Sequence, residues 1–543
     1  MHFTPVADFA SRRSPVVGRG GMLASSQPLA TAAGLGILRA GGTAADAAVA
    51  TAAALNVTEP TSTGIGGDCF ALYYQASTKR VFALNGSGRA PAGLSLELLK
   101  KQGLAELPNF HPHTVTVPGA AAGWADLLAA HGRLSLAQVL APAIELAEGG
   151  FPVAPITSHF WERGVERQLS LAPNGAELTI DGRAPQPGEI FRNPGLARTF
   201  RRLADGGPAA FYQGEIAEAI VAVLTEAGGV MTAADLAAHH STWDEPIFAD
   251  YRGHRVWECP PNGQGLAALL ALNILENFDL SGQDPLGAER WHLMIEAMRL
   301  AFADARWHVA DQATDPAPLE ALLSKQYAAQ RAALLDSQRA VADVQRGRPV
   351  ASSGTVYFSV VDGEGNACSF INSNYQGFGT GIVPKSWGFT LQNRGHGFSL
   401  DPAHPNALAP GKRPYHTIIP AMITHANSGD LFACYGVMGG FMQPQGHMQV
   451  AVGLIDDGLD PQVALDRPRF CIEDGTAGLA VSLEESLPAE TQTRLAAMGH
   501  SVRQLGGLQR AAFGRGQIIL RESDTGVLWG GSDPRADGLA MTL

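Results

Sequence analysis

The chain has 543 residues, of which 45% are apolar and 17% charged, and its formal net charge is −12 without any cluster of Lys and Arg. This length can bury a large core, and the acidic balance argues against nucleic acid or an anionic membrane as a partner. Five scattered cysteines without C-x-x-C spacing indicate buried thiols in a reducing compartment. Because no segment has the pattern of an export signal or a membrane span, the sequence predicts a cytoplasmic protein.

The first 350 residues carry mainly helical patterns. Two segments near the start have the start and stop signals of helices, and Gly41-Gly42 would end the first of them. Later segments place apolar residues at the 3.6-residue spacing of packed helices. The segments 70–74 and 80–84 alternate instead like two paired strands. Residues 310–350 are polar and are predicted to be mostly helical, with an exposed connector at 346–349. The expected helices are 28–40, 44–55, 120–130, 136–148, 216–227 and 291–306.

After residue 355 the pattern changes, and strands dominate. Two helices are expected among them, at 448–454 and 489–497. A helix-rich first part followed by a strand-rich second part favours sheets packed between layers of helices over a row of independent domains. The expected strands are 356–361, 367–372, 387–392, 417–424, 431–436, 516–521 and 526–529.

Thr355 stands at the head of the first of these strands, directly after Gly354. A threonine hydroxyl is a poor nucleophile until a base removes its proton. If the bond between Gly354 and Thr355 were cut, the freed α-amine, with a pKa of about 7.7–8.0, would supply that base. The hydroxyl could make this cut by attacking the Gly354 carbonyl, since glycine tolerates unusual backbone conformations. Threonine is also common at the start of ordinary strands, so the position alone leaves both interpretations open.

Short motifs follow one another in order along nearly the whole chain. They include Gly21-Met22-Leu23-Ala24-Ser25-Ser26-Gln27-Pro28, Gly64-Ile65-Gly66-Gly67, Val117-Pro118-Gly119, Pro260-Pro261-Asn262-Gly263-Gln264-Gly265, Gly439-Gly440 and Asp533-Pro534-Arg535. Together they resemble the γ-glutamyltranspeptidase family of N-terminal-nucleophile hydrolases. The resemblance implies an α+β fold, a four-layer αββα sandwich with two stacked, mainly antiparallel sheets between helix layers. It also implies autocatalytic cleavage into a large chain, 1–354, and a small chain, 355–543, that form one domain.

The resemblance assigns catalytic roles to particular residues. The family's nucleophile falls on Thr355, so Gly354 and Thr355 form the expected cleavage site. The family's oxyanion-hole glycines fall on Gly439 and Gly440, whose successive N–H groups could face a developing negative charge. Ser373 replaces the usual threonine beside the nucleophile and would orient it.

The resemblance also implies a site for a carboxylate of the substrate. Arg89 matches the family arginine that holds this group, and a planar guanidinium suits a carboxylate through two parallel hydrogen bonds. Two family serines that support the same carboxylate fall on His416 and Thr417. His416 departs from the family pattern, although a histidine can still donate a hydrogen bond. Thr417 keeps a hydroxyl at its position.

The chain departs from the family where transpeptidases bind the α-ammonium of a glutamyl group. The family's aspartate falls on Gly397, and its supporting asparagine and glutamine fall on Tyr375 and Arg394. An ammonium placed beside a buried arginine would be unfavourable, because like charges repel and neither is compensated. We therefore predict a substrate amide that bears a carboxylate and lacks an α-amine.

Two further features narrow the expected activity. The segment between Phe398 and Pro414 is too short for the lid loop of some family members, which favours hydrolysis over transfer. The segments 374–379 and 437–447 most resemble the oxamate amidohydrolase subgroup, which converts oxamate to oxalate and ammonia in purine breakdown. The alternatives are a γ-glutamyl hydrolase or transferase, a glutaryl-type acylase, and a binding protein that is never cleaved.

The sequence also predicts which partners the protein has. We expect a small-molecule substrate and the association of the large and small chains of one precursor, while a homo-oligomer stays open. No cofactor is expected, and no metal, because the sixteen histidines include no H-E-x-x-H pattern or Cys/His ligand spacing.

Overall fold

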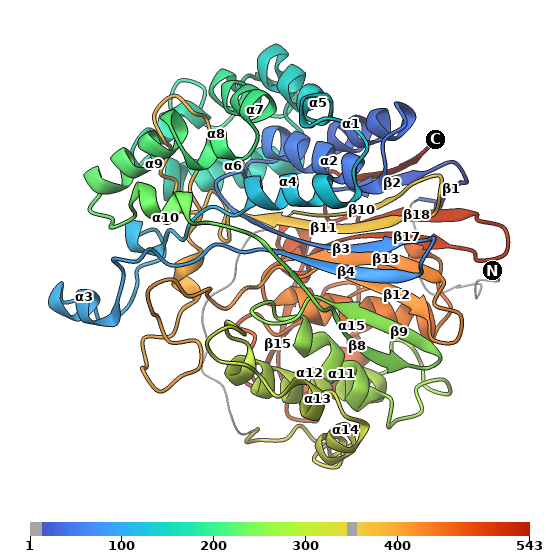
Figure 1. Cartoon of the computed structure of the whole chain (residues 1–543). Coiled ribbons are helices and arrows are strands. Elements are labelled where there is room, and N and C mark those ends of the chain that lie inside the picture. The colour runs from blue at the N-terminus through green and yellow to red at the C-terminus, as the bar shows by residue number, and fades with distance from the viewer. Residues whose placement is uncertain (1–12, 345–355) are drawn as a thin grey trace.

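Two stacked seven-stranded sheets form the centre of the molecule, and helices cover the outer face of each (Figure 1). The computed structural model describes residues 13–344 and 356–543. This order of layers is the αββα sandwich predicted from the sequence. None of the described helices combines the length and apolar character needed to cross a membrane.

The first sheet is antiparallel throughout and lies beneath the N-terminal helices, at the top of Figure 1. Helices α1 (Pro28–Arg39), α2 (Ala44–Thr58) and α4 (Ala120–His131) pack on it, and α5 (Leu136–Gly149) packs behind α2. The strand order is β19 (Leu539–Thr542), β2 (Met22–Ser25), β10 (Val356–Val361), β11 (Ala367–Ser373), β3 (Asp68–Gln75), β4 (Arg80–Gly86) and β7 (Thr242–Asp244).

The second sheet is also antiparallel and faces the helices at the bottom of Figure 1. Helices α11 (Gly265–Leu275) and α15 (Met442–Ile455) pack on it, and α12 (Ala288–His308) packs on α11. The strand order is β1 (Val16–Gly18), β18 (Leu528–Ser532), β17 (Arg515–Arg521), β13 (Leu431–Met438), β12 (Ala421–His425), β9 (His254–Glu258) and β8 (Ile247–Tyr251).

The remaining elements lie around these layers. The longer ones are the helices α6 (Pro155–Gly164), α7 (Pro194–Gly206), α9 (Glu215–Glu226) and α17 (Ala489–Ala497). The short ones are α3 (Leu96–Lys101), α8 (Ala209–Tyr212), α10 (Ala233–Ala237), α13 (Leu319–Leu322), α14 (Lys325–Ala332), α16 (Pro461–Asp466), β5 (Phe151–Pro152), β6 (Ile190–Phe191), β14 (Phe470–Cys471), β15 (Ala480–Glu484) and β16 (Ser501–Leu505).

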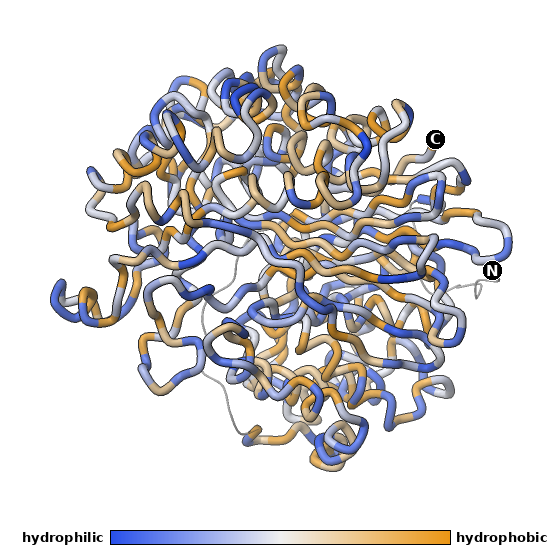
Figure 2. The backbone as a smooth tube through the Cα atoms, viewed as in Figure 1, coloured by the Kyte–Doolittle hydropathy of each residue, from blue (hydrophilic) through white to orange (hydrophobic). Residues whose placement is uncertain are grey.

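The central strands are apolar on both faces because each sheet is covered on both sides. All six residues of β10 are buried, and hydrophobic residues concentrate along the strands of both sheets (Figure 2). The few polar groups between the sheets bond to one another: the Tyr357 hydroxyl lies 2.8 Å from the hydroxyls of Ser359 and Ser369. A short apolar run is therefore the expected signature of these strands, in place of strict alternation.

The two parts of the chain on either side of residue 355 share both sheets. In the first sheet β10 pairs with β2, and β11 pairs with β3. In the second sheet β12 pairs with β9, and β18 pairs with β1. Neither part could therefore complete a sheet by itself, so cleavage between them would leave two chains held together by sheet hydrogen bonds and a common core.

The strand predicted at 387–392 is wrong. This segment is buried but irregular, since Gly388 has a φ of +66° and lies directly against Asn193 and Leu196. Its N–H and C=O groups bond to separate loop residues instead of one neighbouring strand, as in the bonds from Leu391 N–H to the Ile382 carbonyl and from Gln392 N–H to the Gly66 carbonyl. The apolar pattern of 387–392 correctly predicted that the segment is buried, but it could not show that no neighbouring strand pairs with it.

The helical prediction for 310–350 is also largely wrong. Within the described residues this region contains α13 and α14 only, each of fewer than ten residues. Pro316 and Pro318 lack the N–H that an interior helical bond needs, so the helix cannot begin before them. The predicted connector 346–349 lies outside the described residues.

Candidate functional site

The expected cleavage site, Gly354 and Thr355, lies outside the described residues. The described part of the site begins with Val356, the first residue of β10, which pairs with Asn372 of β11. Ser373, the next residue of β11, is completely buried. The predicted partner of the nucleophile therefore stands at the end of the strand that pairs with the first described residue after the cleavage site.

A strained turn follows Ser373. Tyr375 has a φ of +80°, a conformation that costs a side-chain-bearing residue about 1–3 kcal/mol. The Tyr375 N–H donates to the Ser373 hydroxyl over 2.8 Å, which helps to hold the turn. The turn directs the Tyr375 ring over the guanidinium of Arg394, 4.1 Å from its central carbon to the ring centroid.

Arg394 is completely buried and only partly satisfied. Its Nη1 donates to the Thr417 hydroxyl over 2.8 Å, whereas Nε and Nη2 have no hydrogen-bond acceptor within the described chain. Burial lowers the pKa of Arg394 to about 10, so the group stays protonated at neutral pH. A buried charged donor without an acceptor is costly. The Nε and Nη2 groups lie on one edge of the guanidinium, where two parallel N–H groups can receive a carboxylate.

His416 connects this cluster to a buried carboxylate that the sequence reasoning missed. Its Nε2 lies 3.0 Å from Asp68 Oδ2, and burial keeps the pKa of His416 well below 6.5. The neutral ring therefore donates from Nε2 to Asp68, while Nδ1 accepts from the Ile418 N–H. Burial raises the pKa of Asp68 to about 6. The other Asp68 oxygen accepts from the N–H groups of Gly88 and Gly119 and from the Gln392 amide.

Gly439 and Gly440 form the turn between β13 and α15. Their φ angles are +134° and +63°, values that favour glycine, and a Cβ on Gly439 would lie 3.2 Å from the Gly514 backbone. Among the described residues no acceptor is bonded to either N–H. A cavity of about 480 Å³ adjoins this turn, and Gly439 forms part of its wall. Two adjacent backbone N–H groups to which the described residues offer no acceptor suit an oxyanion.

The side chain of Gln264, at the start of α11, joins the two halves of the site. Its Nε2 donates to the carbonyl oxygens of Thr417 and Gly440 over 2.7 and 2.8 Å. Its Oε1 accepts from the Tyr415 hydroxyl over 3.0 Å. One amide thus fixes the distance between the Arg394 cluster and the glycine turn. The sequence signal was the motif around Gln264, to which no role had been assigned.

Arg89 does not join this cluster in the structure. Its side chain is partly exposed, and its Nη1 donates to the His240 carbonyl over 3.2 Å. None of its contacts within the described chain reaches Arg394 or Thr417. Of the predicted substrate-binding residues, the structure brings together Tyr375, Arg394, His416 and Thr417 and leaves Arg89 apart.

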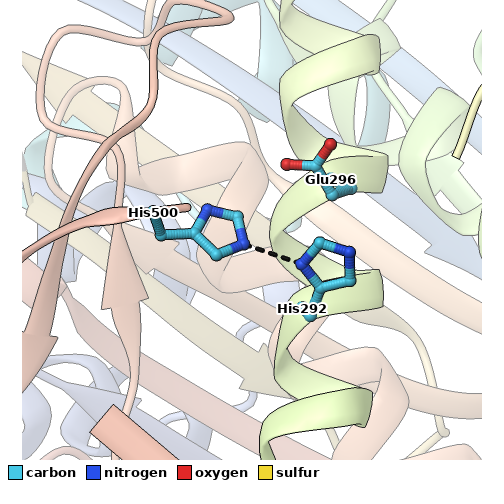
Figure 3. A group of neighbouring side chains, drawn as sticks. All are labelled: His292, Glu296 and His500. Carbon is cyan, nitrogen blue, oxygen red and sulfur yellow. Dashed lines mark hydrogen bonds between the residues drawn. The ribbon is translucent and has the colours of Figure 1, made fainter. Parts of the chain in front are cut away.

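One group of described residues has the composition of a metal site: His292 and Glu296 on α12, with His500 (Figure 3). All three are buried, with one ligand atom of each within 4.8 Å of the others. His292 Nδ1 lies 2.8 Å from His500 Nε2, and Glu296 is paired with Arg299 over 2.5 Å. These contacts already engage the facing nitrogens and compensate the carboxylate. The residues therefore form a hydrogen-bonded cluster that supports the neighbouring chain.

The comparison with known families matches residues 30–543 to a single model, described as Gamma-glutamyltranspeptidase. The chain belongs to the gamma-glutamyltranspeptidase family. Among solved structures, a cephalosporin acylase from Bacillus halodurans is 46% identical, with a TM-score of 0.92 and coverage of 100% of this chain and 99% of that one. This gamma-glutamyltranspeptidase family member is accordingly an N-terminal-nucleophile enzyme of the amidohydrolase and transpeptidase class.

Two relatives of this family member bear names with different substrates. The Glutathione hydrolase-like YwrD proenzyme of Bacillus subtilis is 38% identical over 97% of this chain and 99% of that protein. The Oxamate amidohydrolase proenzyme of Klebsiella pneumoniae is 35% identical over 96% and 98%. The two identities, 38% and 35%, are too similar to indicate which of the two named substrates this chain would use. Both are named proenzymes, which indicates that such a precursor is processed into a large and a small chain.

Proposed function

We propose that this protein cleaves itself before Thr355 and then hydrolyses a small amide whose acyl part carries a carboxylate and lacks an α-amine. The observation that supports this proposal is the buried edge of Arg394, whose Nε and Nη2 have no acceptor in the described chain. A carboxylate would satisfy both donors and compensate the charge. An ammonium in the same place would face a buried cation.

The proposed reaction begins with the Thr355 hydroxyl, whose proton passes to the residue's own α-amine as the oxygen attacks the amide carbonyl. The N–H groups of Gly439 and Gly440 would hold the resulting oxyanion, where one donor contributes about 2.7–4 kcal/mol. The C–N bond then breaks, and the amine leaves with the proton. Water splits the acyl ester and restores the threonine. Ser373 would orient the nucleophile.

The carboxylate of the acyl part would bind to Arg394, supported by Thr417 and stacked under Tyr375. His416 would hold this segment in place through Asp68. The role proposed for Arg89 is that of a second cation at the entrance, since its side chain lies apart from the buried cluster. Oxamate is the smallest substrate that satisfies this description, and its products would be oxalate and ammonia. The 35% identity to an oxamate amidohydrolase proenzyme supports this choice.

Two other substrates each have one observation in their favour. The 46% identity to a cephalosporin acylase favours a glutaryl-type amide, which also carries a carboxylate and no α-amine. The 38% identity to a glutathione hydrolase-like protein favours a γ-glutamyl amide, which carries an α-ammonium. Arg394 is compatible with the first of these and disfavours the second.

A substrate panel tests the proposal. Purified, processed protein is assayed for release of ammonia or amine from oxamate, a glutaryl amide and a γ-glutamyl amide at equal concentration. We expect kcat/KM for at least one of the first two to exceed that for the γ-glutamyl amide by more than tenfold. A clear preference for the γ-glutamyl amide would overturn the role given to Arg394.

A further inference from the structure

A single buried carboxylate, that of Asp68, accepts hydrogen bonds from four separate segments of the chain. Its Oδ1 lies 3.0 Å from the Gly88 nitrogen, 3.1 Å from the Gly119 nitrogen and 2.9 Å from Gln392 Nε2. Its Oδ2 accepts from His416 Nε2 over 3.0 Å. The side chain is completely buried. Four donors aimed at one buried side chain require the ionised form, because a carboxylate only accepts, whereas a protonated acid would turn a hydrogen toward one of them.

The chain around Asp68 lets two backbone N–H groups approach the carboxylate closely. A Cβ on Gly88 would lie 1.6 Å from the Val117 carbonyl oxygen, and a Cβ on Gly119 would lie 2.0 Å from the Gly86 carbonyl oxygen. Both distances are far below van der Waals contact, so a side chain fits at neither position. The two loops therefore bring their N–H groups to Asp68 only because both positions are glycine.

Two of the anchored segments lead directly to the residues proposed to bind the acyl carboxylate. Gln392 stands two residues before Arg394. His416 directly precedes Thr417, whose hydroxyl accepts from Arg394 Nη1 over 2.8 Å. Asp68 is thus bonded to the neighbours of both partners in the bond between Arg394 and Thr417. A shift of its carboxylate would therefore move both partners.

The place of Asp68 in the first sheet brings these segments together. It is the first residue of β3 and lies opposite Ser373, the last residue of β11. On the other side of β11, Val356 at the start of β10 lies opposite Asn372. The carboxylate therefore stands at the end of the sheet where the small chain is expected to begin.

We propose that Asp68 is a positioning residue, which holds Arg394 and Thr417 in the geometry that receives the acyl carboxylate. The proposal rests on the function proposed above. Asp68 would act through Gln392 and His416 and would not touch the substrate. Within the described chain the Arg394 guanidinium has one hydrogen bond of its own, so its position depends on these neighbours. A planar guanidinium binds a carboxylate strongly only when two N–H groups are aligned with it.

A purely electrostatic role for the same carboxylate predicts the opposite effect. Burial raises the pKa of Asp68 to about 6, so the group is negative at neutral pH. Removing this charge would leave Arg394 less compensated and would strengthen its attraction for a carboxylate. Removing a positioning group would weaken carboxylate binding instead. The direction of the change therefore distinguishes the two roles.

Matched substrates measure the selectivity for a carboxylate. Oxamate is compared with oxamide, and glutaryl p-nitroanilide with the analogue in which a carboxamide replaces the free carboxylate. The selectivity is the ratio of kcat/KM for the acid to kcat/KM for its neutral analogue. For processed parent protein we expect a ratio of about tenfold or more, as for a charged hydrogen bond.

Substitution of Asp68 should lower this ratio. Asp68→Asn keeps an oxygen for the three donors at Oδ1 but turns an amide N–H toward the N–H of His416, and it should lower the ratio by about three- to tenfold. Asp68→Ala removes every acceptor and should lower it further. The loss should appear as a higher KM for the acid. For the neutral analogue kcat/KM should change by less than about twofold, because that substrate does not use the Arg394 charge.

Asp46 provides a matched control. It is also completely buried, and its carboxylate accepts from the backbone N–H groups of Thr43, Arg133 and Leu134. It lies in the first turn of α2, whose N-terminus bonds to Asp362 beyond the last residue of β10, at the other end of the first sheet. Asp46→Asn should lower the free energy of unfolding and leave the selectivity ratio unchanged.

Gln392→Leu tests the same link without altering Asp68, and it applies even where Asp68→Ala does not fold. It should lower the ratio by about two- to threefold. If the Asp68 and Gln392 variants leave the ratio unchanged or raise it, the positioning role is overturned while the proposed function stands. If the parent protein shows no preference for the carboxylate, the function proposed for Arg394 fails, and this inference fails with it.

Discussion

Arg394 and Arg299 are both almost completely buried, at 0% and 1% exposed, yet their surroundings differ. Arg299 donates from all three nitrogens, to Glu296 and to the carbonyl oxygens of Val341, Ala477 and Gly478. Arg394 makes one hydrogen bond, to Thr417, and leaves two nitrogens without an acceptor in the described chain. Burial alone therefore does not separate a structural arginine from a binding one, whereas the state of its donors does.

The surroundings of Arg299 show what a fully paired charge does for a fold. Together with His292 and Glu296 it holds the segment 336–341 against α12, since His292 Nε2 lies 2.7 Å from the Asp336 carbonyl and the Val341 N–H donates to Glu296. The cluster in Figure 3 thus supports the chain that leads toward the expected cleavage site. We expect changes here to affect stability first and activity only through it.

The largest effect is expected when the proposed nucleophile is removed, because the reaction in which Arg394 would bind the substrate then cannot occur. We expect Thr355→Ala to yield a single uncut chain of 57.0 kDa and to reduce activity by more than about 10³-fold, because no hydroxyl remains to attack. A denaturing gel with intact mass, followed by assay on the best amide, measures both effects. Two chains in this variant would place the nucleophile elsewhere.

The next largest effect is expected at Arg299. In the uncut Thr355→Ala background, where processing plays no part, Arg299→Gln should lower the free energy of unfolding by about 3–5 kcal/mol, because Glu296 would remain buried without its partner. Thermal and denaturant unfolding measure the change. Arg201→Gln, at an exposed pair with Glu148, should cost less than about 1 kcal/mol. Equal losses in the two variants would contradict a structural role for the buried cluster.

In contrast to Arg299, replacing Arg394 should reduce activity strongly and stability only slightly. Arg394→Gln is expected to lower kcat/KM for carboxylate-bearing amides by about 10- to 150-fold, the equivalent of 1.5–3 kcal/mol for a charged hydrogen bond. Its free energy of unfolding should change by less than about 1 kcal/mol, since the described chain holds no carboxylate in direct ion-pair contact with this guanidinium. Arg394→Lys keeps the charge without the planar fork and should recover part of the activity. A large loss of stability without loss of kcat/KM would make this arginine structural.

The smallest expected effect is a dependence of stability on pH at His500. Burial lowers the pKa of His500 to about 3, below the value of about 6.5 in an unfolded chain. The unfolded state therefore binds the proton first as pH falls below 6.5, and stability present above that pH is lost. A single group of this kind contributes about 1.4 kcal/mol per pH unit. Between pH 6.5 and 5, His500→Gln, which keeps a donor toward His292, should lose about 1–2 kcal/mol less than the parent in denaturant unfolding. Equal losses would contradict this assignment.

Local patterns predicted many elements but not their partners. The strand at 356–361 and the helix at 489–497 appear at the predicted residues, because a short apolar run and a periodic stripe are local properties. The segment 387–392 has a similar pattern, yet it forms irregular contacts with distant loops. Whether an apolar segment pairs as a strand depends on whether the fold brings the open edge of a sheet beside it. The residues of the segment itself do not contain that information.

In the candidate site, too, the sequence showed which residue types are present, while the structure showed which of them are in contact. The departures at Tyr375 and Arg394 were visible in the sequence, and the structure places the two residues together. The partnership of His416 with Asp68 was not visible, since 348 residues separate them. The same holds for the bridge that Gln264 makes between Thr417 and Gly440. Such contacts arise where strands from both parts of the chain meet in shared sheets.

By itself the sequence predicted sheets packed between helix layers, because apolar patterns are local. Its ordered motifs indicated the family, and the resemblance to that family implied the αββα sandwich and the expected catalytic positions. Only the tertiary structure decided which charges are paired. Within residues 13–344 and 356–543 it showed Arg299 bonded through all three nitrogens and Arg394 with two donors that have no acceptor. The reason is physical: the effect of a buried or clustered charge depends on donors and acceptors brought in from distant segments, and the packed fold alone sets those positions.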